Sequence, residues 1–423
     1  MKFKYLASLL TLAAGLTAFS EAALADIVVK WQPGDNAANI QKAINTGDKR
    51  IIIPYPGKHW MIGQPIRMTK PNQTIIFEPG VVLLAQKGAF KHKFRSMITV
   101  EANNVTLSGY KAQLVMRKND YANPKLYEKS EWRHTINVRG ARNFKIEGLT
   151  LKNSGGDGIQ LTHGPNQPNQ LPVSKFSSGT IKDVTSVGNY RQGLSIVSGQ
   201  NVFVKNSIFK DTHGTDPASG VDLEPDHPWQ KLVNINFINT KFINNQRNGI
   251  NIGLWKYHGA GVTDVTINFH GCESINNGKY GIKIEGIDDG LYNGPKGHIV
   301  LKNCKFAQSK EDGIHIRNDQ VNPAKTFNVK FENTAVNYNG KNSAEFYPVK
   351  LHNTHEAGGI SNINFGNNFV VRDWLDRPPL FASYFARVQG ISNVHGNIRV
   401  ENPKKKPVDL GKNLKNVTLK FTN

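Results

Sequence analysis

Two acidic residues stand close together in a strongly basic chain. The stretch GVDLEPDHP over residues 220–228 places Asp222 and Glu224 two positions apart, in a chain of 423 residues with a formal net charge of +21. In an extended strand, side chains alternate between the two faces and the rise is roughly 3.3 Å per residue, so these carboxylates share one face about 7 Å apart. Such carboxylates repel unless a cation, a metal ion or a proton lies between them. The stretch predicts either a surface ion-pair group or a site for acid–base or metal chemistry.

The acidic stretch is one of six similar segments. Each has a small turn, a glycine and alternating large apolar residues: DGIQLT from Asp157, QGLSIV from Gln192, SGVDLE from Ser219, NGINIG from Asn248, YGIKIE from Tyr280 and DGIHIR from Asp312. Successive glycines are 35, 27, 29, 32 and 32 residues apart, with a second alternating run, usually led by Asn, between them. Short strands at this period, without helical periodicity between them, predict an all-β solenoid of stacked coils.

Stacking the six strands at about 4.8 Å predicts columns of outward side chains. The first column is Gln160, Ser195, Asp222, Asn251, Lys283 and His315. The second column, two residues further along each strand, is Thr162, Val197, Glu224, Gly253, Glu285 and Arg317. Ionisable groups from distant parts of the sequence gather on one face, and we interpret this face as functional. A solvated surface remains the alternative, especially for His315.

Several residues close to the acidic strand complete the candidate site. The loop before that strand contains His213, and three further loop residues precede their own strands at the same corner: Tyr190, Arg191 and Arg247. Either Arg247 and Lys283 neutralise the acids, or a calcium ion does so, with oxygen ligands from Asp222, Glu224 and Asn251. Trp229 and Trp255 are either platforms for the apolar faces of sugars or residues buried beneath a loop.

The rest of the chain predicts an exported protein with one domain. Residues 1–25 combine Lys2 and Lys4 with an apolar run and Ala23-Leu24-Ala25, which is typical of a secretory signal peptide. Residues 26–423 then form a single solenoid domain, with an N-terminal cap over about 26–60 that includes a helix at 36–45, coils over about 60–400 and a charged tail at 401–423. Cys272 and Cys304 are one coil length apart, so they lie on neighbouring coils as a disulfide or as a reduced pair.

The charge of the chain limits the classes of partner. An excess of basic residues favours an anionic partner such as nucleic acid, a membrane surface or an acidic polymer. Export argues against nucleic acid, and no segment after the leader is apolar enough to cross a bilayer. We therefore expect a monomer, periplasmic or secreted, that meets an anionic polysaccharide.

The order of the motifs resembles a known superfamily. A capping helix, IIIPYPGKHW, FEPGVVLLA, SGGDGI and GVDLEP follow one another as in the right-handed parallel β-helix proteins of the pectate-lyase superfamily. That superfamily includes polysaccharide lyases, glycoside hydrolases and uronate epimerases. The resemblance implies a right-handed, single-stranded parallel β-helix. Alginate and chondroitin lyases of this kind pair acidic metal ligands with a Lys base and an Arg, which implies Asp222 and Glu224 as ligands and alginate as the first substrate to test.

Charge, export and resemblance together predict a lyase that cleaves a uronate-containing polysaccharide by β-elimination. A cation neutralises the uronate carboxylate, a base removes the neighbouring C5 proton and an acid assists the leaving oxygen. We predict Lys283 as the base, with His213 or Tyr190 as rivals, and Arg247 as carboxylate ligand or acid. The predicted substrate-binding residues are Arg191, Asn251, His315, Arg317, Trp229 and Trp255.

Three alternatives stay open from the sequence. Asp222 and Glu224, at about 7 Å, match the roughly 6.5–9.5 Å separation of inverting glycosidases, so hydrolysis is one alternative. A C5-epimerase is another, because it shares the proton abstraction. A non-catalytic protein that binds acidic glycans is the third; it predicts basic residues spread over several faces, whereas an enzyme predicts that they converge on the acidic pair.

Overall fold

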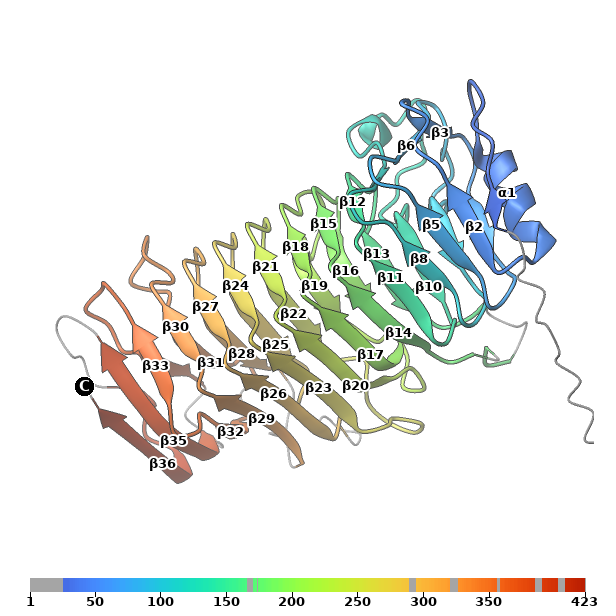
Figure 1. Cartoon of the computed structure of the whole chain (residues 1–423). Helices are drawn as coiled ribbons and strands as arrows, with labels where there is room; N and C mark the ends of the chain where they lie inside the picture. The colour runs from blue at the N-terminus through green and yellow to red at the C-terminus, as the bar shows by residue number, and fades with distance from the viewer. Residues whose placement is uncertain are drawn as a thin grey trace, which may run out of the picture.

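The computed structural model describes residues 26–165, 170–172, 174–288, 294–319, 326–355, 358–384, 390–401 and 408–422. The predicted leader at 1–25 and the basic run Lys404, Lys405 and Lys406 lie outside these residues. The chain winds into a stack of coils that runs from α1 (Ala37–Thr46) at one end to the last strands at the other (Figure 1). The predicted β-solenoid is confirmed.

One sheet of the stack carries the candidate site. Within the described residues it has eleven strands, all paired in parallel. In chain order they are β4 (Ile66–Met68), β7 (Ile98–Val100), β10 (Ile136–Arg139), β13 (Ile159–Thr162), β16 (Gln192–Ile196), β19 (Ser219–Leu223), β22 (Ile250–Gly253), β25 (Ile282–Glu285), β28 (Ile314–Asn318), β31 (Val349–Asn353) and β34 (Leu380–Ser383). We call this the eleven-stranded sheet.

The remaining strands cover the other sides of each coil in two parallel rows. The first row is β1 (Ile27–Val28), β2 (Arg50–Ile53), β5 (Thr74–Phe77), β8 (Thr106–Ser108), β11 (Phe144–Glu147), β14 (Ser177–Lys182), β17 (Gly199–Lys205), β20 (Leu232–Ile238), β23 (Val265–His270), β26 (Gly297–Lys302), β29 (Phe327–Glu332), β32 (Ile360–Asn364), β35 (Ile391–Glu401) and β36 (Leu414–Thr422). The second row is β3 (Trp60–Ile62), β6 (Val82–Ala85), β9 (Gln113–Val115), β12 (Thr150–Lys152), β15 (Thr185–Val187), β18 (Ile208–Lys210), β21 (Lys241–Ile243), β24 (Glu273–Ile275), β27 (Lys305–Ala307), β30 (Ala335–Asn337) and β33 (Phe369–Arg372). From β2–β4 to β32–β34, each coil therefore contributes one strand to each row and one to the eleven-stranded sheet.

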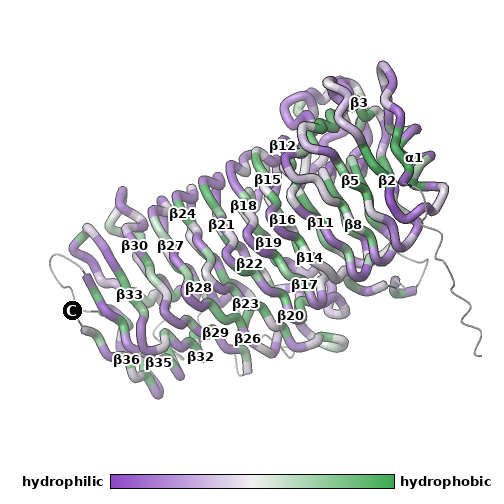
Figure 2. The backbone as a smooth tube through the Cα atoms, in the orientation of Figure 1, coloured by the Kyte–Doolittle hydropathy of each residue, from purple (hydrophilic) through white to green (hydrophobic). Residues whose placement is uncertain are grey.

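The register of the eleven-stranded sheet confirms the first predicted column. Asp222 is aligned with Ser195 on one side and with Asn251 on the other, and the same column continues through Lys283 and His315. Inward side chains stack into one continuous core, and polar and apolar residues alternate along the strands (Figure 2). The period-2 pattern in the sequence thus places its apolar half in the core and its polar half in the columns.

The repeated glycines mark the tightest approach between coils. A Cβ atom at Gly193 would lie 2.5 Å from the carbonyl oxygen of Gly220, and one at Gly220 would lie 2.7 Å from that of Gly249. The same contact recurs from Gly249 to Gly281, at 2.8 Å, and from Gly281 to Gly313, at 2.5 Å. Any side chain at these positions would push neighbouring backbones apart. Close stacking therefore explains why each of the six segments contains a glycine.

The ends of the stack are covered in different ways. At the N-terminal end, α1 buries Ala37, Ile40, Ala43 and Ile44, close to the predicted helix at 36–45. A short 3₁₀ helix, η1 (Asp120–Ala122), lies in the long loop before β10. The C-terminal tail contains β36, which pairs with β35 and was not predicted from the sequence. No helix among the described residues is long and apolar enough to cross a membrane.

The two cysteines occupy equivalent positions, as predicted. Each directly precedes a strand, β24 or β27, and those strands pair with Glu273 opposite Lys305. Both thiols are free and buried, so of the two predicted states the structure has the reduced one.

Candidate functional site

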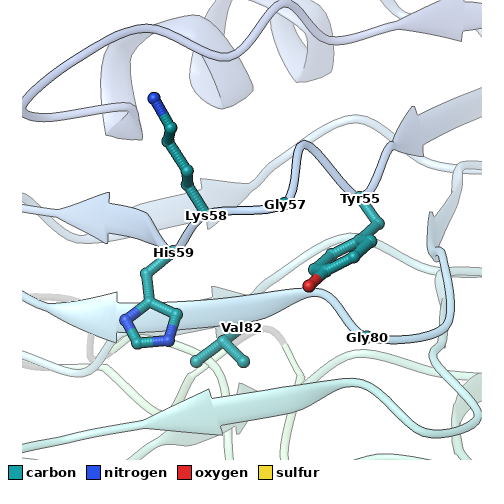
Figure 3. Close-up of a pocket in the computed structure, with 6 residues that line it drawn as sticks. All are labelled: Tyr55, Gly57, Lys58, His59, Gly80 and Val82. Carbon is teal, nitrogen blue, oxygen red and sulfur yellow. The ribbon is translucent and has the colours of Figure 1, made fainter.

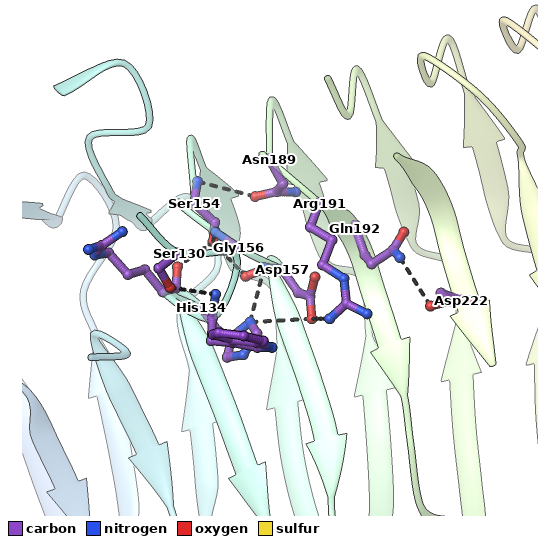
Figure 4. Close-up of polar contacts among 12 residues, drawn as sticks. Ser130, His134, Ser154, Gly156, Asp157, Asn189, Arg191, Gln192 and Asp222 are labelled. Carbon is purple, nitrogen blue, oxygen red and sulfur yellow. Dashed lines mark hydrogen bonds and ion pairs between the residues drawn. The ribbon is translucent and has the colours of Figure 1, made fainter. Parts of the chain in front are cut away.

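The carboxyl group of Asp222 is held by the coils on both sides of it. It is fully buried, and its two oxygens accept hydrogen bonds from Gln192 Nε2 at 3.0 Å and Asn251 Nδ2 at 2.9 Å (Figure 4). Gln192 Oε1 accepts the backbone N–H of Ser219 at 3.1 Å, which fixes the orientation of that amide. Asp222 is therefore rigidly placed and out of contact with solvent.

Glu224 lies at the end of the same strand and reaches the surface. Its side chain is 17% exposed, and its carboxyl group forms a hydrogen bond with that of Asp222. Burial, followed by the charge of Asp222, raises the pKa of Glu224 to about 7, and burial raises the pKa of Asp222 to about 6. Asp222 lies in β19 and Glu224 directly follows that strand, and each carboxyl group affects the pKa of the other. The pair therefore retains a shared proton near neutral pH.

Arg191 supplies the positive charge nearest to this pair. It precedes β16 on the adjacent coil, and its side chain is 17% exposed, with Nη1 4.0 Å from Asp157 Oδ2. Burial lowers the pKa of Arg191, but the carboxylates of Asp157 and Asp222 raise it by more, so the pKa lies above its ordinary value. Arg191 lies beside Asp157 (Figure 4), and its charge partly offsets the rise in pKa that burial causes at Asp157 and at Asp222.

Asp157 is a third buried acid. It is fully buried, and neither carboxyl oxygen forms a hydrogen bond with a described residue. Burial raises the pKa of Asp157 to about 7 and lowers that of the adjacent His134 to about 3, so His134 is neutral. His134 Nδ1 accepts the backbone N–H of Asp157 at 3.0 Å and lies 3.3 Å from Asp157 Oδ2. At the second contact, His134 Nδ1 and an ionised Asp157 Oδ2 would both be hydrogen-bond acceptors. A protonated Asp157 avoids this conflict, and its raised pKa agrees with that protonation.

A fourth acid stands on the exposed side of Glu224. Asp226 is half exposed and receives an ion pair from Lys256, whose Nζ lies 2.9 Å from Asp226 Oδ1 and 4.0 Å from Glu224 Oε1. The charge of Asp226 contributes to the raised pKa of Glu224. Lys256 therefore holds an ionised carboxylate close to a carboxyl group that keeps its proton.

Two aromatic rings lie in the loops that follow the acidic strand and its neighbour. A Cβ atom at Gly253 would lie 3.6 Å from the indole of Trp255 and 3.8 Å from Glu224 Cγ, so the missing side chain leaves room for the ring beside the acid. Trp229 stacks on His227 at 5.4 Å between ring centroids and meets His163 edge-on at 5.0 Å. Both tryptophans are partly exposed, which suits rings that contact a sugar.

The predicted counter-ions of the acids are wrong. Arg247 is bonded to the exposed carboxylate of Asp216, and Lys283 Nζ lies 2.6 Å from Glu285 Oε2. Strand stacking puts Lys283 two strands from Asp222, while Glu285 lies on the same strand and face and is nearer. The charge that faces Asp222 comes from Arg191, which the sequence suggested only for binding substrate.

Of the other predicted residues, Tyr190, His213, His315 and Arg317 form no hydrogen bond or ion pair with Asp222 or Glu224 in the described structure. His213 is exposed in the loop before β19, and the ring of Tyr190 packs on Gly214 of the next coil. Asn251 contacts Asp222 directly, as its column position predicted. His315 and Arg317 lie on β28, three strands away, where His315 Nδ1 bonds Asp312 Oδ2 at 2.7 Å. The predicted Lys283, Arg247, His213 and Tyr190 therefore stay untested as catalytic residues.

The donors around Asp222 do not fit a calcium ion. Calcium binds oxygen ligands, whereas both oxygens of Asp222 face amide N–H groups, one of which is fixed by its own backbone bond. Within the described part of the chain, no cluster of three or more His, Cys, Asp or Glu side chains is arranged to hold a metal. Calcium binding stays a prediction that these contacts do not favour.

The residues missed from the sequence share a recognisable position. Asp157, Gln192 and Ser219 each stand directly before a repeat glycine, where the loop turns into the strand, and form a third polar column beside the two predicted ones. Reading that column would have placed Asp157 and Gln192 next to Asp222. Asp226 and Lys256 leave no such signal, because both lie in loops whose path the repeat does not define.

A separate hollow lies far from these acids, near the N-terminal cap. It has a volume of about 340 Å³ and is lined by Tyr55, Gly57, Lys58, His59, Gly80 and Val82 (Figure 3). Its residues belong to the first coils, and none of them is acidic. It is not the place where the acids gather.

Comparisons with known proteins agree with the fold. A family described as "Right handed beta helix region" matches residues 129–293, which contain all of the acids above, and no curated protein matches the sequence. The A-module of the mannuronan C-5 epimerase AlgE6 of Azotobacter vinelandii is similar at 11% identity and a TM-score of 0.61, over 92% of this chain and 96% of that one. A family 28 exopolygalacturonase of Yersinia enterocolitica is similar at 12% identity and 0.53, over 94% and 78%. The Agl-KA catalytic domain is similar at 12% and 0.58, over 94% and 68%. The chain is a right-handed parallel β-helix protein.

Proposed function

We propose that this protein is an exported enzyme that hydrolyses glycosidic bonds in an acidic, uronate-containing polysaccharide, at the site formed by Glu224, Asp226 and Arg191. The observation that carries the proposal is the position of Glu224. Its partly exposed carboxyl group shares a proton with buried Asp222 and lies beside the ion-paired Asp226 and the ring of Trp255.

Glu224 is the general acid. A carboxyl group that protonates a glycosidic oxygen must hold its proton at the working pH, and a pKa of about 7 meets that condition. Asp222 is fully buried and does not reach substrate; its charge keeps the proton on Glu224. The buried pair therefore acts as one proton donor, with Asp222 as its positioning residue.

Asp226 is the general base. Its carboxylate is exposed to solvent, and Lys256 holds it close to Glu224 without covering it. In the reaction, Glu224 gives its proton to the leaving oxygen as the C–O bond breaks, water attacks the sugar carbon and Asp226 takes the proton of that water. Glycosidases use two such carboxyl groups, one on each side of the bond that is cut.

The basic charge and the aromatic rings favour a uronate substrate. Arg191 places a guanidinium next to the acids, and guanidinium groups bind carboxylates through paired hydrogen bonds. Trp255 and Trp229 offer ring faces at the same corner. The similar folds include proteins named for mannuronan and polygalacturonan, both uronate polymers, which supports this substrate class.

β-Elimination is a second candidate, and one observation favours it. A carboxyl group with a pKa of about 7 is also a matched base, and Arg191 beside it supplies the cation that acidifies the C5 proton of a uronate. Glu224 then replaces Lys283 as the base, because Lys283 Nζ is engaged in an ion pair with Glu285 at 2.6 Å. Alginate is the first substrate to test for this elimination reaction.

The test is to incubate the purified protein with alginate, pectate, hyaluronan and chondroitin while measuring reducing ends and the ultraviolet absorbance of unsaturated uronates. Hydrolysis predicts new reducing ends without that absorbance; a rise in absorbance moves the reaction to elimination. We expect Glu224→Gln and Asp226→Asn each to lower kcat by roughly 10²–10⁴-fold, the usual contribution of an acid or base. We also expect calcium chelation to leave the rate unchanged.

The control is Glu332→Gln, which removes an exposed carboxylate on β29, outside the eleven-stranded sheet. It should keep full activity. A wild-type protein that cuts none of these polymers, or a Glu224→Gln variant with the activity of the control, would refute the proposal. A loss on chelation that calcium restores would show that the acids bind a metal after all.

A further inference from the structure

Basic side chains gather at a second place on the eleven-stranded sheet. Lys283, His315 and Lys350 are aligned in register on β25, β28 and β31, and Arg317 and His352 are aligned in the neighbouring column. We call these five residues the basic patch. It lies toward the C-terminal end of the same face that carries Asp222.

Part of the basic patch has no anionic partner among the described residues. Lys283 is paired with Glu285, His315 with Asp312, and Arg317 Nη2 lies 3.8 Å from Asp319. Lys350, in contrast, has no described carboxylate within 4.0 Å and lies over the ring of Tyr347 at 5.8 Å. The Nε of Arg317 is buried and forms no hydrogen bond with a described group. Donors are thus left over for a ligand.

His352 is surrounded by positively charged side chains. Burial, followed by the charges of His315, Lys350 and Arg317, lowers the pKa of His352 to about 4, and Asp312 offsets this only in part. The ring of His352 lies edge-on to His315 at 5.6 Å. An anion placed between these groups would favour the protonated form of His352 and raise its pKa.

Aromatic rings border the basic patch on the same face. Phe381 on β34 continues the column of Lys350, and its ring stacks on Tyr347 at 4.1 Å and 8°. Tyr280 stacks on His315 at 4.4 Å. Phe381 and Tyr347 are partly exposed, so apolar ring surface lies beside Lys350, which has no described carboxylate partner. This combination suits a sugar ring that carries a negative charge.

We propose that the basic patch is a second carbohydrate subsite, which binds the carboxylate of a uronate residue between Lys350, Arg317 and His352 with its sugar ring on Phe381. The inference rests on the proposed function in one respect, namely that one polysaccharide chain runs along the sheet to both places. His315 and Lys350 stand three and four strands from Asp222, or about 14–19 Å at the spacing of paired strands. Only oligosaccharides long enough to span that distance reach both sites.

The experiment uses oligomannuronates and oligogalacturonates, from disaccharide to octasaccharide, with binding followed by calorimetry in the Glu224→Gln background so that nothing is cut. We expect affinity to rise once the chain is long enough to reach the patch. Lys350→Ala combined with His352→Gln should lower the affinity of the long oligomers about 10- to 100-fold, the effect of losing charged hydrogen bonds, and leave that of the disaccharides unchanged. Lys330→Ala removes an equal charge from β29 and should change neither.

A second measurement does not depend on these variants. Proton NMR of the His352 ring should show its pKa rise when the octasaccharide binds, and stay constant with an octasaccharide whose carboxyl groups have been reduced to alcohols. The proposal is wrong if the His352 pKa does not move, or if the Lys350 and His352 double variant binds every length as its parent does. If the wild type cuts no polysaccharide but the double variant still binds the long oligomers more weakly, the proposal of hydrolysis is wrong and the proposal of a second subsite is supported.

Discussion

At the scale of single residues, retained protons and the charge of Arg191 limit the repulsion between the crowded acids of the site. Asp157 and Asp222 are fully buried and Glu224 mostly so, and the cations that the described residues bring near them are Arg191 beside Asp157 and Lys256 beside Glu224. Buried carboxyl groups that cannot all be neutralised retain protons, and all three have raised pKa values. The same burial that makes Glu224 a proton donor therefore makes the fold sensitive to pH.

Asp157 should make the protein less stable as the pH rises. Its folded-state pKa, about 7, lies above the ordinary value of 3.8, so the folded state binds the proton more tightly than the unfolded state. The stabilisation is complete below pH about 4 and is lost as the pH rises through about 7, a difference of about 4 kcal/mol. Asp157→Asn should flatten this part of the curve of unfolding free energy against pH, measured by urea denaturation.

The control for that experiment is Asp216→Asn, because the Asp216 side chain is 72% exposed. Its curve should keep the slope of the wild type. An Asp157→Asn curve with the wild-type slope would mean that Asp157 is ionised throughout and that Arg191 fully compensates its charge.

Glu224 should set the alkaline limit of activity. If it is the general acid, kcat/KM falls as the pH rises through about 7, since the reactive form is the protonated one. If it is instead the base of an elimination, kcat/KM rises through the same range. A pH profile between about 5 and 9 therefore decides the role of Glu224, and a flat profile would remove it from the proton transfers.

At the scale of the elements, each coil is fixed by a glycine that no other residue can replace. A Cβ atom at Gly249 would lie 1.9 Å from Ser274 Oγ and 2.8 Å from the carbonyl oxygen of Gly281. Gly253, four residues later in the same coil, meets no atom closer than 3.6 Å. The two positions look alike in the sequence but differ in what surrounds them.

We expect Gly249→Ala to destabilise the protein by about 1–3 kcal/mol or more, the usual effect of overpacking, because the backbones of neighbouring coils must move. Gly253→Ala is the matched control and should fold with nearly wild-type stability, since its methyl group makes only ordinary contacts. Denaturant unfolding measures both. Equal destabilisation by the two variants would show that strand conformation, and not close stacking, selects glycine in the repeat.

The repeat also explains how much of the site the sequence predicts. Spacing defines the register, so Asn251 beside Asp222 follows directly from the period of the glycines. Side-chain direction at the corners does not follow from it: Arg191 and Arg247 occupy similar loop positions, yet one turns to the buried acids and the other to Asp216. Strand residues were therefore placed correctly, and the counter-ions were not.

At the scale of the whole molecule, a long parallel sheet presents its side chains as an extended track. Successive side chains within one column repeat at about 4.8 Å, so a polymer lying along the axis meets one new set of side chains per coil. The acids of the proposed active site and the basic patch share this sheet. With a net charge of +21, we expect the chain to attract a polyanion along its length as well as at the proposed site of cleavage.

Salt should therefore act on binding more than on chemistry. Raising the ionic strength from about 0.1 M to about 1 M shortens the Debye length from about 10 Å to about 3 Å, which screens the exposed basic residues but not the buried acid pair. We expect KM for the polymer to rise several-fold while kcat stays within about a factor of two, since Asp222 is fully buried and Glu224 is only 17% exposed. Thermal unfolding at the same salt concentrations separates this effect from loss of fold. A fall in kcat at constant KM would contradict this prediction. The exposed basic residues would then affect the proton transfer and not the binding of the polysaccharide.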